Sequence, residues 1–299
     1  MEPLFSVLIP VFNSEKLVSQ TIDSVLSQTY KNYELIVVDD GSSDGSKNVL
    51  ESYRDSLQAH FQCHQGAEAA RNNAAAAAKG EYLVFLDHDD LLLPYALATY
   101  QSIIAKFEVP LIIGNMLYFE NQFDLKNEIA QPCESEVFIF DDYLSKSVTV
   151  AISFSIIVIR KDLFERVGGL KGGDDYSFML SIGTFGPCAI IKSPKSVAHR
   201  MHAGNWHKNL AQMIEILRLI IQKESRGEYP GGWQRSLDRK AYIGGIAWTW
   251  VRYAYRGRQP FLAAKLLVRY GLMIAMGALR KLCKSKTAPS RVQVPLPTK

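Results

Sequence analysis

Short apolar runs alternate with amphipathic segments along the first third of the chain. Each run has the length of a buried strand, and residues typical of a turn or a helix start follow it. We predict strands at Phe5–Pro10, Glu34–Val38, Gln58–Cys63 and Tyr82–Leu86.

The segments between these runs have helical spacing or helical composition. Apolar residues at helical spacing follow Ser14, which we expect to cap this first helix. Ser43 or Asp44 is expected to cap the second helix. Ala67–Lys79 is predicted to be helical because of its alanines.

Strands that are apolar throughout and separated by helices indicate a mostly parallel sheet covered on both faces. In such sheets, ligands bind where the carboxyl ends of the strands open into a crevice. Asp39 and Asp40 end the second run, and the acidic cluster Asp87–Asp90 ends the fourth. We therefore expect both groups of carboxylates to line one crevice of an α/β domain.

The pattern becomes less regular after the fourth run. We expect strands at Leu111–Gly114, Val137–Phe140 and Ser155–Arg160, and helices at Lys161–Val167 and Asp174–Ile182.

Residues 206–284 form a helical and basic region, and residues 285–299 are predicted to be a disordered tail because prolines lie among basic and polar residues. No Asp or Glu follows Asp238, whereas Lys and Arg continue to the last residue. Such a region fits an acceptor or an anionic membrane surface, and a solvated helical subdomain is the alternative.

Composition narrows the class of protein. The chain has 299 residues and a formal net charge of +4, which gives no indication of nucleic-acid binding. The four cysteines show no zinc-site or disulfide spacing, no signal-peptide pattern is present, and no uninterrupted apolar run reaches the roughly 18 residues of a membrane span. We expect a cytoplasmic protein, with the cytoplasmic face of a membrane as a site of peripheral contact.

The carboxylates of Asp87, Asp89 and Asp90 would repel one another on one loop unless a cation neutralised them. Oxygen ligands select hard ions, so Mg²⁺ or Mn²⁺ shared with phosphate oxygens is expected. A capped turn is the alternative interpretation.

The acids at Asp39 and Asp40 are more than a helix cap requires, and a carboxylate there can accept hydrogen bonds from a nucleoside. The chain has neither a GxGxxG sequence after the first strand nor a GxxxxGK[ST] loop. Dinucleotide enzymes and P-loop NTPases are therefore disfavoured.

Six segments follow one another in a characteristic order: Leu8–Asn13, Leu26–Tyr30, Glu34–Ser42, Ala70–Asn72, Gly80–Tyr82 and Phe85–Asp90. Together they closely resemble family 2 glycosyltransferases of the GT-A fold. The resemblance continues more loosely through Phe164–Leu170, Gly173–Tyr176 and His199–His202. It implies a Rossmann-related catalytic domain over residues 1–205, with no family counterpart for the last third of the chain.

The resemblance also implies a role for each matching residue on the nucleotide side. Pro10, Val11 and Phe12 would hold the nucleoside together with Asp40, which would face the base. Arg71 would help to orient the nucleotide.

On the reaction side, Asp87 and Asp89 look like the family's DxD pair, with Asp87 directed towards ribose or metal and Asp89 a direct metal ligand. His202 would contact the metal or the diphosphate. Asp175 matches the catalytic base, and Asp174 matches its acidic neighbour on the acceptor side.

These roles imply an inverting glycosyltransferase that uses Mn²⁺ or Mg²⁺. It would move one sugar from a nucleotide-sugar, preferably a UDP-sugar, to a glycan or lipid-linked glycan in the synthesis of surface polysaccharide or lipopolysaccharide. A metal stabilises the leaving diphosphate without a proton, so a single carboxylate suffices as base. The Gln-x-x-Arg-Trp signature of processive synthases is absent, which favours single addition.

Departures from the family pattern motivate an alternative. His88 stands inside the DxD pair, Gly173 precedes the acidic pair, and an expected Arg is missing from Ser181–Thr184. A non-catalytic protein that binds a nucleotide or glycan on the same fold is therefore the rival interpretation. A sugar-phosphate nucleotidyltransferase is disfavoured because Val11–Asn13 replaces the Gly-rich, Arg-containing loop that it requires.

Overall fold

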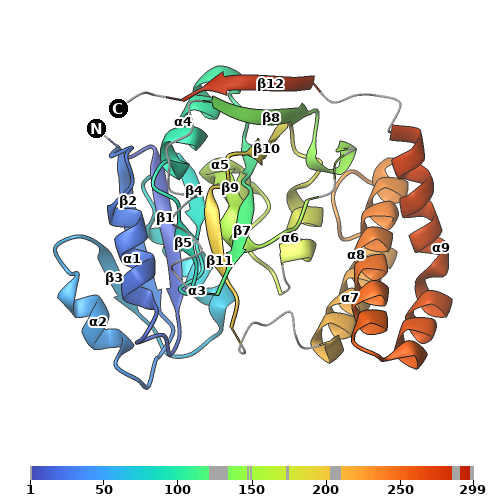
Figure 1. The fold of residues 1–299 in the computed structure, drawn as a ribbon, viewed down its shortest axis with the longest axis horizontal. Coiled ribbons are helices and arrows are strands. Elements are labelled where there is room, and N and C mark those ends of the chain that lie inside the picture. The colour runs from blue at the N-terminus through green and yellow to red at the C-terminus, as the bar shows by residue number, and fades with distance from the viewer. Residues whose placement is uncertain are drawn as a thin grey trace.

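The computed structural model describes residues 2–120, 134–146, 148, 150–172, 175–202, 210–284 and 290–296. A nine-stranded sheet with helices packed around it forms the larger part, and three long helices stand beside it (Figure 1). The α/β class and the helical C-terminal region are as the sequence predicts.

The parallel half of the sheet comes from the first apolar runs. Its strands are β1 (Phe5–Val11), β2 (Tyr33–Asp39), β3 (Gln58–Phe61) and β4 (Tyr82–Phe85), in the order β4-β1-β2-β3. Phe5 pairs with Tyr33 on one side and Tyr82 on the other, and all seven residues of β1 are buried. Because a central parallel strand is covered on both faces, it reads in the sequence as an unbroken apolar run.

The helices of this half are α1 (Val18–Leu26), α2 (Ser46–Ser52), α3 (Ala67–Ala77) and α4 (Ala96–Phe107). The prediction that Ser14 caps α1 with its side chain is wrong, since the residue before the helix is Leu17 and makes no side-chain cap. The Ser14 hydroxyl instead lies 2.7 Å from Nδ1 of His88. Asp44 does bond the start of α2, accepting from the Ser46 backbone N–H at 2.9 Å.

Beyond β4 the strand pairs are antiparallel, except for the parallel pair of β6 and β10. The strands are β6 (Leu111–Ile113), β8 (Glu134–Phe140), β9 (Ile157–Arg160), β10 (Cys188–Ser193) and β12 (Ser290–Pro295), and the full order is β12-β8-β10-β6-β9-β4-β1-β2-β3. A second sheet contains β5 (Leu91–Leu92), β11 (Val197–Arg200) and β7 (Met116–Phe119). Helices α5 (Lys161–Arg166) and α6 (Asp175–Ile182) lie between β9 and β10 in the chain.

The C-terminal helices are α7 (Leu210–Ser225), α8 (Ser236–Arg256) and α9 (Pro260–Lys284). Helices α8 and α9 approach closely at Gly244, where an added Cβ would lie 1.8 Å from the carbonyl oxygen of Met273. Only glycine permits this contact. Figure 1 shows α9 as the outermost of the three helices.

The prediction of a disordered tail is wrong for Ser290–Pro295, which forms strand β12 (Figure 1). This strand pairs antiparallel with β8, Val294 is buried, and Arg291 lies 2.6 Å from Glu136. Proline and basic residues suit an edge strand, which leaves one side unpaired, so their presence did not prevent strand formation.

Candidate functional site

Asp40 organises the first loop of the site. It follows β2, is almost fully buried, and accepts hydrogen bonds from Nε2 of Gln62 at 2.7 Å and from the backbone N–H groups of Gln65 and Gly66 at 2.8 Å each. Nδ1 of His64 lies 2.9 Å from the same carboxylate. A buried carboxylate requires such partners, and here they fix the loop that leads into α3.

Phe12 presents an aromatic ring beside this loop. Its side chain is 40% exposed and stacks on the ring of His64, with 4.2 Å between the ring centroids. The side chains of Pro10 and Val11 are buried within β1. Of the three residues in the predicted nucleoside loop, Phe12 therefore offers the accessible side chain, and His64 is a neighbour that no motif in the sequence connects with it.

Arg71 on α3 forms an ion pair with Asp87, which follows the end of β4. One guanidinium nitrogen lies 2.5 Å from Oδ1 of Asp87, and the guanidinium carbon lies 4.2 Å from the ring centre of Phe154. Burial opposes ionisation of Asp87, but Arg71 lowers the pKa of that carboxyl below its usual value. Nε of Arg71 is buried without a hydrogen-bond partner in the structure.

Asp89 lies next to His202. Oδ2 of Asp89 and Nε2 of His202 are 2.8 Å apart, and both side chains are partly exposed. Arg200 donates from Nε to the backbone carbonyl of Asp89 at 2.9 Å, so strand β11 holds this loop in place. Among the residues that the structure describes, no group of three His, Cys, Asp or Glu side chains is arranged to hold a metal ion.

Asp90 has a different surrounding from its neighbours. Its buried carboxylate accepts from the Ser155 hydroxyl at 2.6 Å and from the Arg200 backbone N–H at 3.1 Å, and Nδ1 of His199 lies 3.0 Å away. Burial raises the pKa of Asp90. Burial opposes protonation of His199, but its hydrogen bond to Asp90 raises the His199 pKa. Asp90 thus anchors the acidic loop to β11, and does not belong to an exposed triad of carboxylates.

Asp175 is the first residue of α6, where a negative charge is favoured by the helix dipole. Its Oδ1 accepts from the Tyr176 backbone N–H at 3.1 Å. Asp174, the predicted acidic neighbour, lies outside the described residues.

The segment before Asp175 is docked on the helix that carries Arg71. Asn72 exchanges two hydrogen bonds of 2.9 Å with the backbone of Leu170, and Glu68 accepts from the Gly172 N–H at 2.5 Å. The segment that leads to the predicted base, Asp175, therefore packs on α3, the helix that contains the predicted nucleotide-binding residue Arg71, although about a hundred residues separate them in the chain.

The sequence model of Glycosyl transferase family 2 matches residues 6–168, which is more than half of the chain. The glucosyltransferase WfaP of Escherichia coli, named as acting between UDP-Glc and α-D-GlcNAc-diphosphoundecaprenol, is 29% identical over 73% of this chain and 86% of its own length. The chain spans only 33–41% of the length of glycosyltransferases from Rickettsia typhi, Streptococcus pneumoniae and Nostoc, at 32–40% identity.

Solved structures show the same fold. TarS of Staphylococcus aureus superposes with a TM-score of 0.58 at 17% identity, over 81% of this chain and 70% of that one. The mannosyltransferase PcManGT of Pyrobaculum calidifontis, solved with GDP-Man and Mn²⁺, gives 0.55 at 20% identity, over 96% of this chain and 88% of its own. From its matched segment and its fold, the chain belongs to the family 2 glycosyltransferases.

Proposed function

We propose that this chain is an inverting, metal-dependent glycosyltransferase that moves one sugar from a UDP-sugar to a hydroxyl of a lipid-linked glycan in polysaccharide synthesis. The observation that carries the proposal is the pairing of Asp89 with His202 next to the ion pair of Arg71 with Asp87. Donor-side groups of opposite charge are thereby gathered at the carboxyl end of β4, where ligands bind in sheets of this kind.

The residues at this end fit a divalent ion. Asp89 and His202 place an oxygen and a nitrogen ligand atom side by side, and a donor diphosphate would supply the remaining oxygens. A bound ion of this kind stabilises the negative charge on the departing diphosphate without a proton transfer. The solved Mn²⁺ complex of PcManGT supports Mn²⁺ as the first ion to test.

Two further groups are suited to the nucleotide. Phe12 offers a ring for stacking beside the buried Asp40, and the unpartnered Nε of Arg71 is a donor available to an anionic ligand. UDP is the preferred nucleotide because WfaP is named for UDP-Glc and a TarS structure holds UDP-GlcNAc.

The transfer needs one proton acceptor. As the acceptor oxygen forms a bond to the anomeric carbon, Asp175 takes the hydroxyl proton. The bond from that carbon to the diphosphate oxygen breaks, and its electron pair leaves with the nucleoside diphosphate. Attack on the face opposite the leaving group inverts the anomeric configuration. Docking of the segment before Asp175 on α3 supports this role, because it places the start of α6 on the donor side of the molecule.

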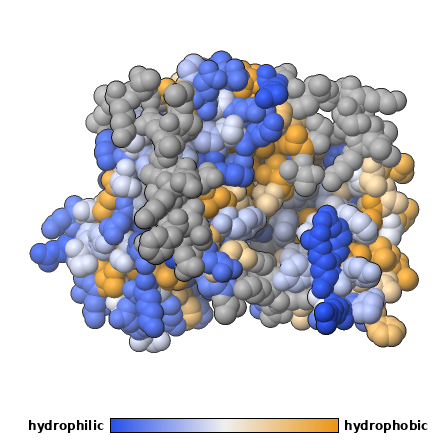
Figure 2. Space-filling view, viewed as in Figure 1, coloured by the Kyte–Doolittle hydropathy of each residue, from blue (hydrophilic) through white to orange (hydrophobic). Residues whose placement is uncertain are grey.

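A membrane surface is the proposed location of the acceptor. The segment Pro260–Arg280 of α9 is long and apolar enough to cross a bilayer by length and composition alone, although Lys265 and Arg269 interrupt its apolar run, and 17% of its most apolar 18-residue stretch is buried. Phe261, Val268 and Leu272 point outward with exposures of 92, 89 and 79%. Figure 2 shows apolar side chains along the edge of the molecule that α9 forms.

Lys265 and Arg269 are also exposed on α9. Basic residues beside an exposed apolar stripe suit a helix lying in the interface of an anionic membrane more than one crossing it. We place α9 on the cytoplasmic face of such a membrane, where a lipid-linked acceptor is presented.

Hydrolysis of the donor without acceptor tests the proposal. UDP-glucose incubated with the chain and Mn²⁺ should release UDP slowly, and EDTA should stop the release. Asp89→Asn should abolish the release while its circular dichroism spectrum stays native. Asp55→Asn is the matched control, since Asp55 is an exposed residue outside the site. Release that is independent of Mn²⁺ and of Asp89 would contradict the metal mechanism, and donor binding without turnover would support the non-catalytic rival.

A further inference from the structure

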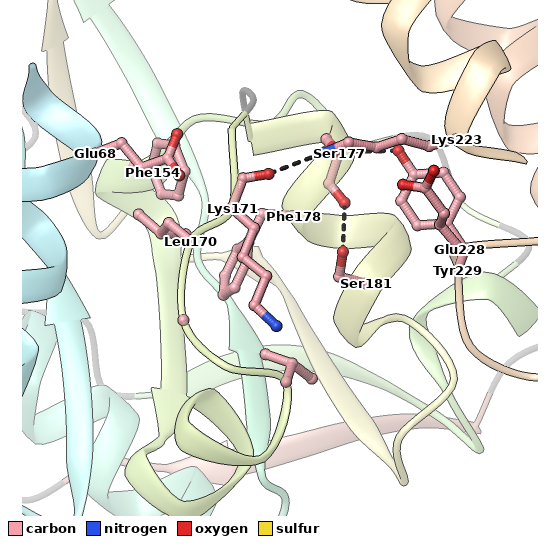
Figure 3. A pocket seen from close by; sticks show the side chains of 12 residues that line it. Glu68, Phe154, Leu170, Lys171, Ser177, Phe178, Ser181, Lys223, Glu228 and Tyr229 are labelled. Atoms are coloured by element: carbon pink, nitrogen blue, oxygen red, sulfur yellow. Dashed lines mark hydrogen bonds between the residues drawn. The ribbon is translucent and has the colours of Figure 1, made fainter. Parts of the chain in front are cut away.

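A pocket of about 200 Å³ lies between α6 and α7, beside the segment that precedes Asp175 (Figure 3). Its walls come from parts of the chain that are far apart in the sequence. Glu68 belongs to α3, Lys171 to the docked segment, Ser181 to α6, and Lys223 to α7.

The pocket adjoins both sides of the proposed reaction. Phe154, which lines it, packs against the guanidinium of Arg71 at 4.2 Å. Ser177 and Ser181 line it from α6, the helix that begins at Asp175. A molecule in the pocket would therefore lie between the donor-side arginine and the helix that carries the base.

The same charged walls hold the base segment in place. Lys223 donates to the backbone carbonyls of Lys171 and Gly172 at 2.9 Å each, and Glu68 accepts from the Gly172 N–H. The C-terminal region thus closes the pocket and fixes the approach to Asp175 with one side chain.

The chemistry of the lining suits a neutral polyhydroxylated ring. The hydroxyls of Ser177 and Tyr229 lie 3.0 Å apart, and the Ser181 hydroxyl lines the same space. Hydroxyls both donate and accept, as sugar hydroxyls require. Two carboxylates (Glu68 and Glu228) balance two ammonium groups (Lys171 and Lys223), so the pocket carries no net charge that would select an anion such as a diphosphate.

The size limits the ligand further. A volume of about 200 Å³ is below the roughly 300–1,000 Å³ of sites for drug-sized ligands. This volume suits a ligand of about one sugar ring.

We infer that this pocket binds the single acceptor sugar whose hydroxyl attacks the donor, with α7 and the segment at Glu228–Tyr229 forming its outer wall. The inference rests on the proposed function, and it assigns part of the acceptor selection to the C-terminal region, which the family match to residues 6–168 does not reach.

A bulky side chain in the pocket tests the inference. Ser181→Trp fills the space, and Ser102→Trp is its matched control. Each serine is half-buried on a helix and donates its hydroxyl to the carbonyl four residues earlier, at 3.1 Å for Ser181 and 3.0 Å for Ser102. The probe is methyl α-N-acetylglucosaminide, detected by saturation-transfer difference NMR in the presence of UDP and Mn²⁺.

The wild type and Ser102→Trp should both transfer saturation to the ring protons of the probe, and Ser181→Trp should lose the signal. A second variant guards against misfolding. The side chain of Glu228 is 44% exposed and its ion-pair partner Arg226 lies 3.6 Å away, so Glu228→Ala should fold and weaken probe binding by about tenfold.

No saturation transfer in the wild type, or an equal signal in Ser181→Trp, would overturn the inference. Stabilisation by UDP-glucose and Mn²⁺ in a thermal-shift assay separates this outcome from failure of the proposed function. If the donor stabilises the wild type but the probe does not bind, the pocket assignment is contradicted and the proposed function is not. If the wild type binds the probe but not the donor, the proposed use of UDP-glucose is contradicted.

Discussion

The two halves of the molecule satisfy their buried charges in different ways. In the parallel half, the buried carboxylate of Asp40 is satisfied by the backbone and side chains of its own loop. In the C-terminal helices, the buried Glu224 and Arg239 satisfy each other, with 2.5 Å between them, and this pair is part of the core. The difference shows that a buried carboxylate can be held by hydrogen bonds of its own loop in one half and by an ion pair between two helices in the other.

The largest expected effect is a loss of stability from a variant in the C-terminal helices. Arg239→Ala leaves the carboxylate of Glu224 buried without its partner, which costs about 3–5 kcal/mol in the free energy of unfolding. Urea denaturation should show the loss, and the exposed Arg252→Ala is the control. A change below about 1 kcal/mol would mean that the pair is not part of the core.

A second variant is expected to lower transfer activity without unfolding the C-terminal helices. Arg71→Met removes the partner of Asp87 and the buried, unpartnered Nε donor, so transfer from UDP-glucose should fall by about 10²–10³-fold. The melting temperature should change little compared with Arg239→Ala. Steady-state kinetics with a synthetic GlcNAc-diphospho-lipid acceptor measures the effect, and unchanged kinetics would remove Arg71 from the nucleotide site.

The outward surface of α9 gives a smaller effect. Leu272→Asp places a charge in the exposed apolar stripe, and partition onto vesicles that contain anionic lipid should weaken by roughly tenfold or more. Co-sedimentation measures it, with Leu237→Asp on α8, also an exposed leucine, as the comparison. Equal binding by the wild type and Leu272→Asp would exclude this stripe as the membrane contact.

The smallest effect concerns acid stability of the parallel half. Burial opposes ionisation of Glu34, but hydrogen bonds from Ser6, Gln58 and the Lys79 and Gly80 backbone lower its pKa below 4.5. The stability that this carboxylate contributes is therefore present above pH 4.5 and is lost as the pH falls through the lowered pKa. Glu34→Gln should flatten the pH dependence of urea unfolding below pH 4.5, and an unchanged slope would contradict the assignment.

The sequence predicts the parallel half well because its strands are buried on both faces and its signals are local. The runs at Phe5–Pro10 and Tyr82–Leu86 needed no tertiary information to be recognised. The small strands β7, β10 and β11 were not predicted, and β12 was taken for a disordered tail, because each depends on an edge or a neighbouring strand far away in the chain.

The same limit applies to the site. The acids at Asp40, Asp87 and Asp89 stand out in the sequence because they follow strands. The sequence does not show that these acids have different partners. Asp87 pairs with Arg71, Asp89 with His202 and Asp90 with Ser155, and each partner lies far away in the chain. Likewise, no sequence signal connects Lys223 with the segment before Asp175, since the contact is a side chain reaching a backbone carbonyl.

The most direct measurement of the central claim is a titration of Mn²⁺ followed by electron paramagnetic resonance, with and without UDP. We expect one bound ion per chain, bound more tightly in the presence of UDP, and a loss of at least about tenfold in affinity in Asp89→Asn and in His202→Asn. Mn²⁺ binding that is the same in both variants, or that does not respond to UDP, would contradict the account.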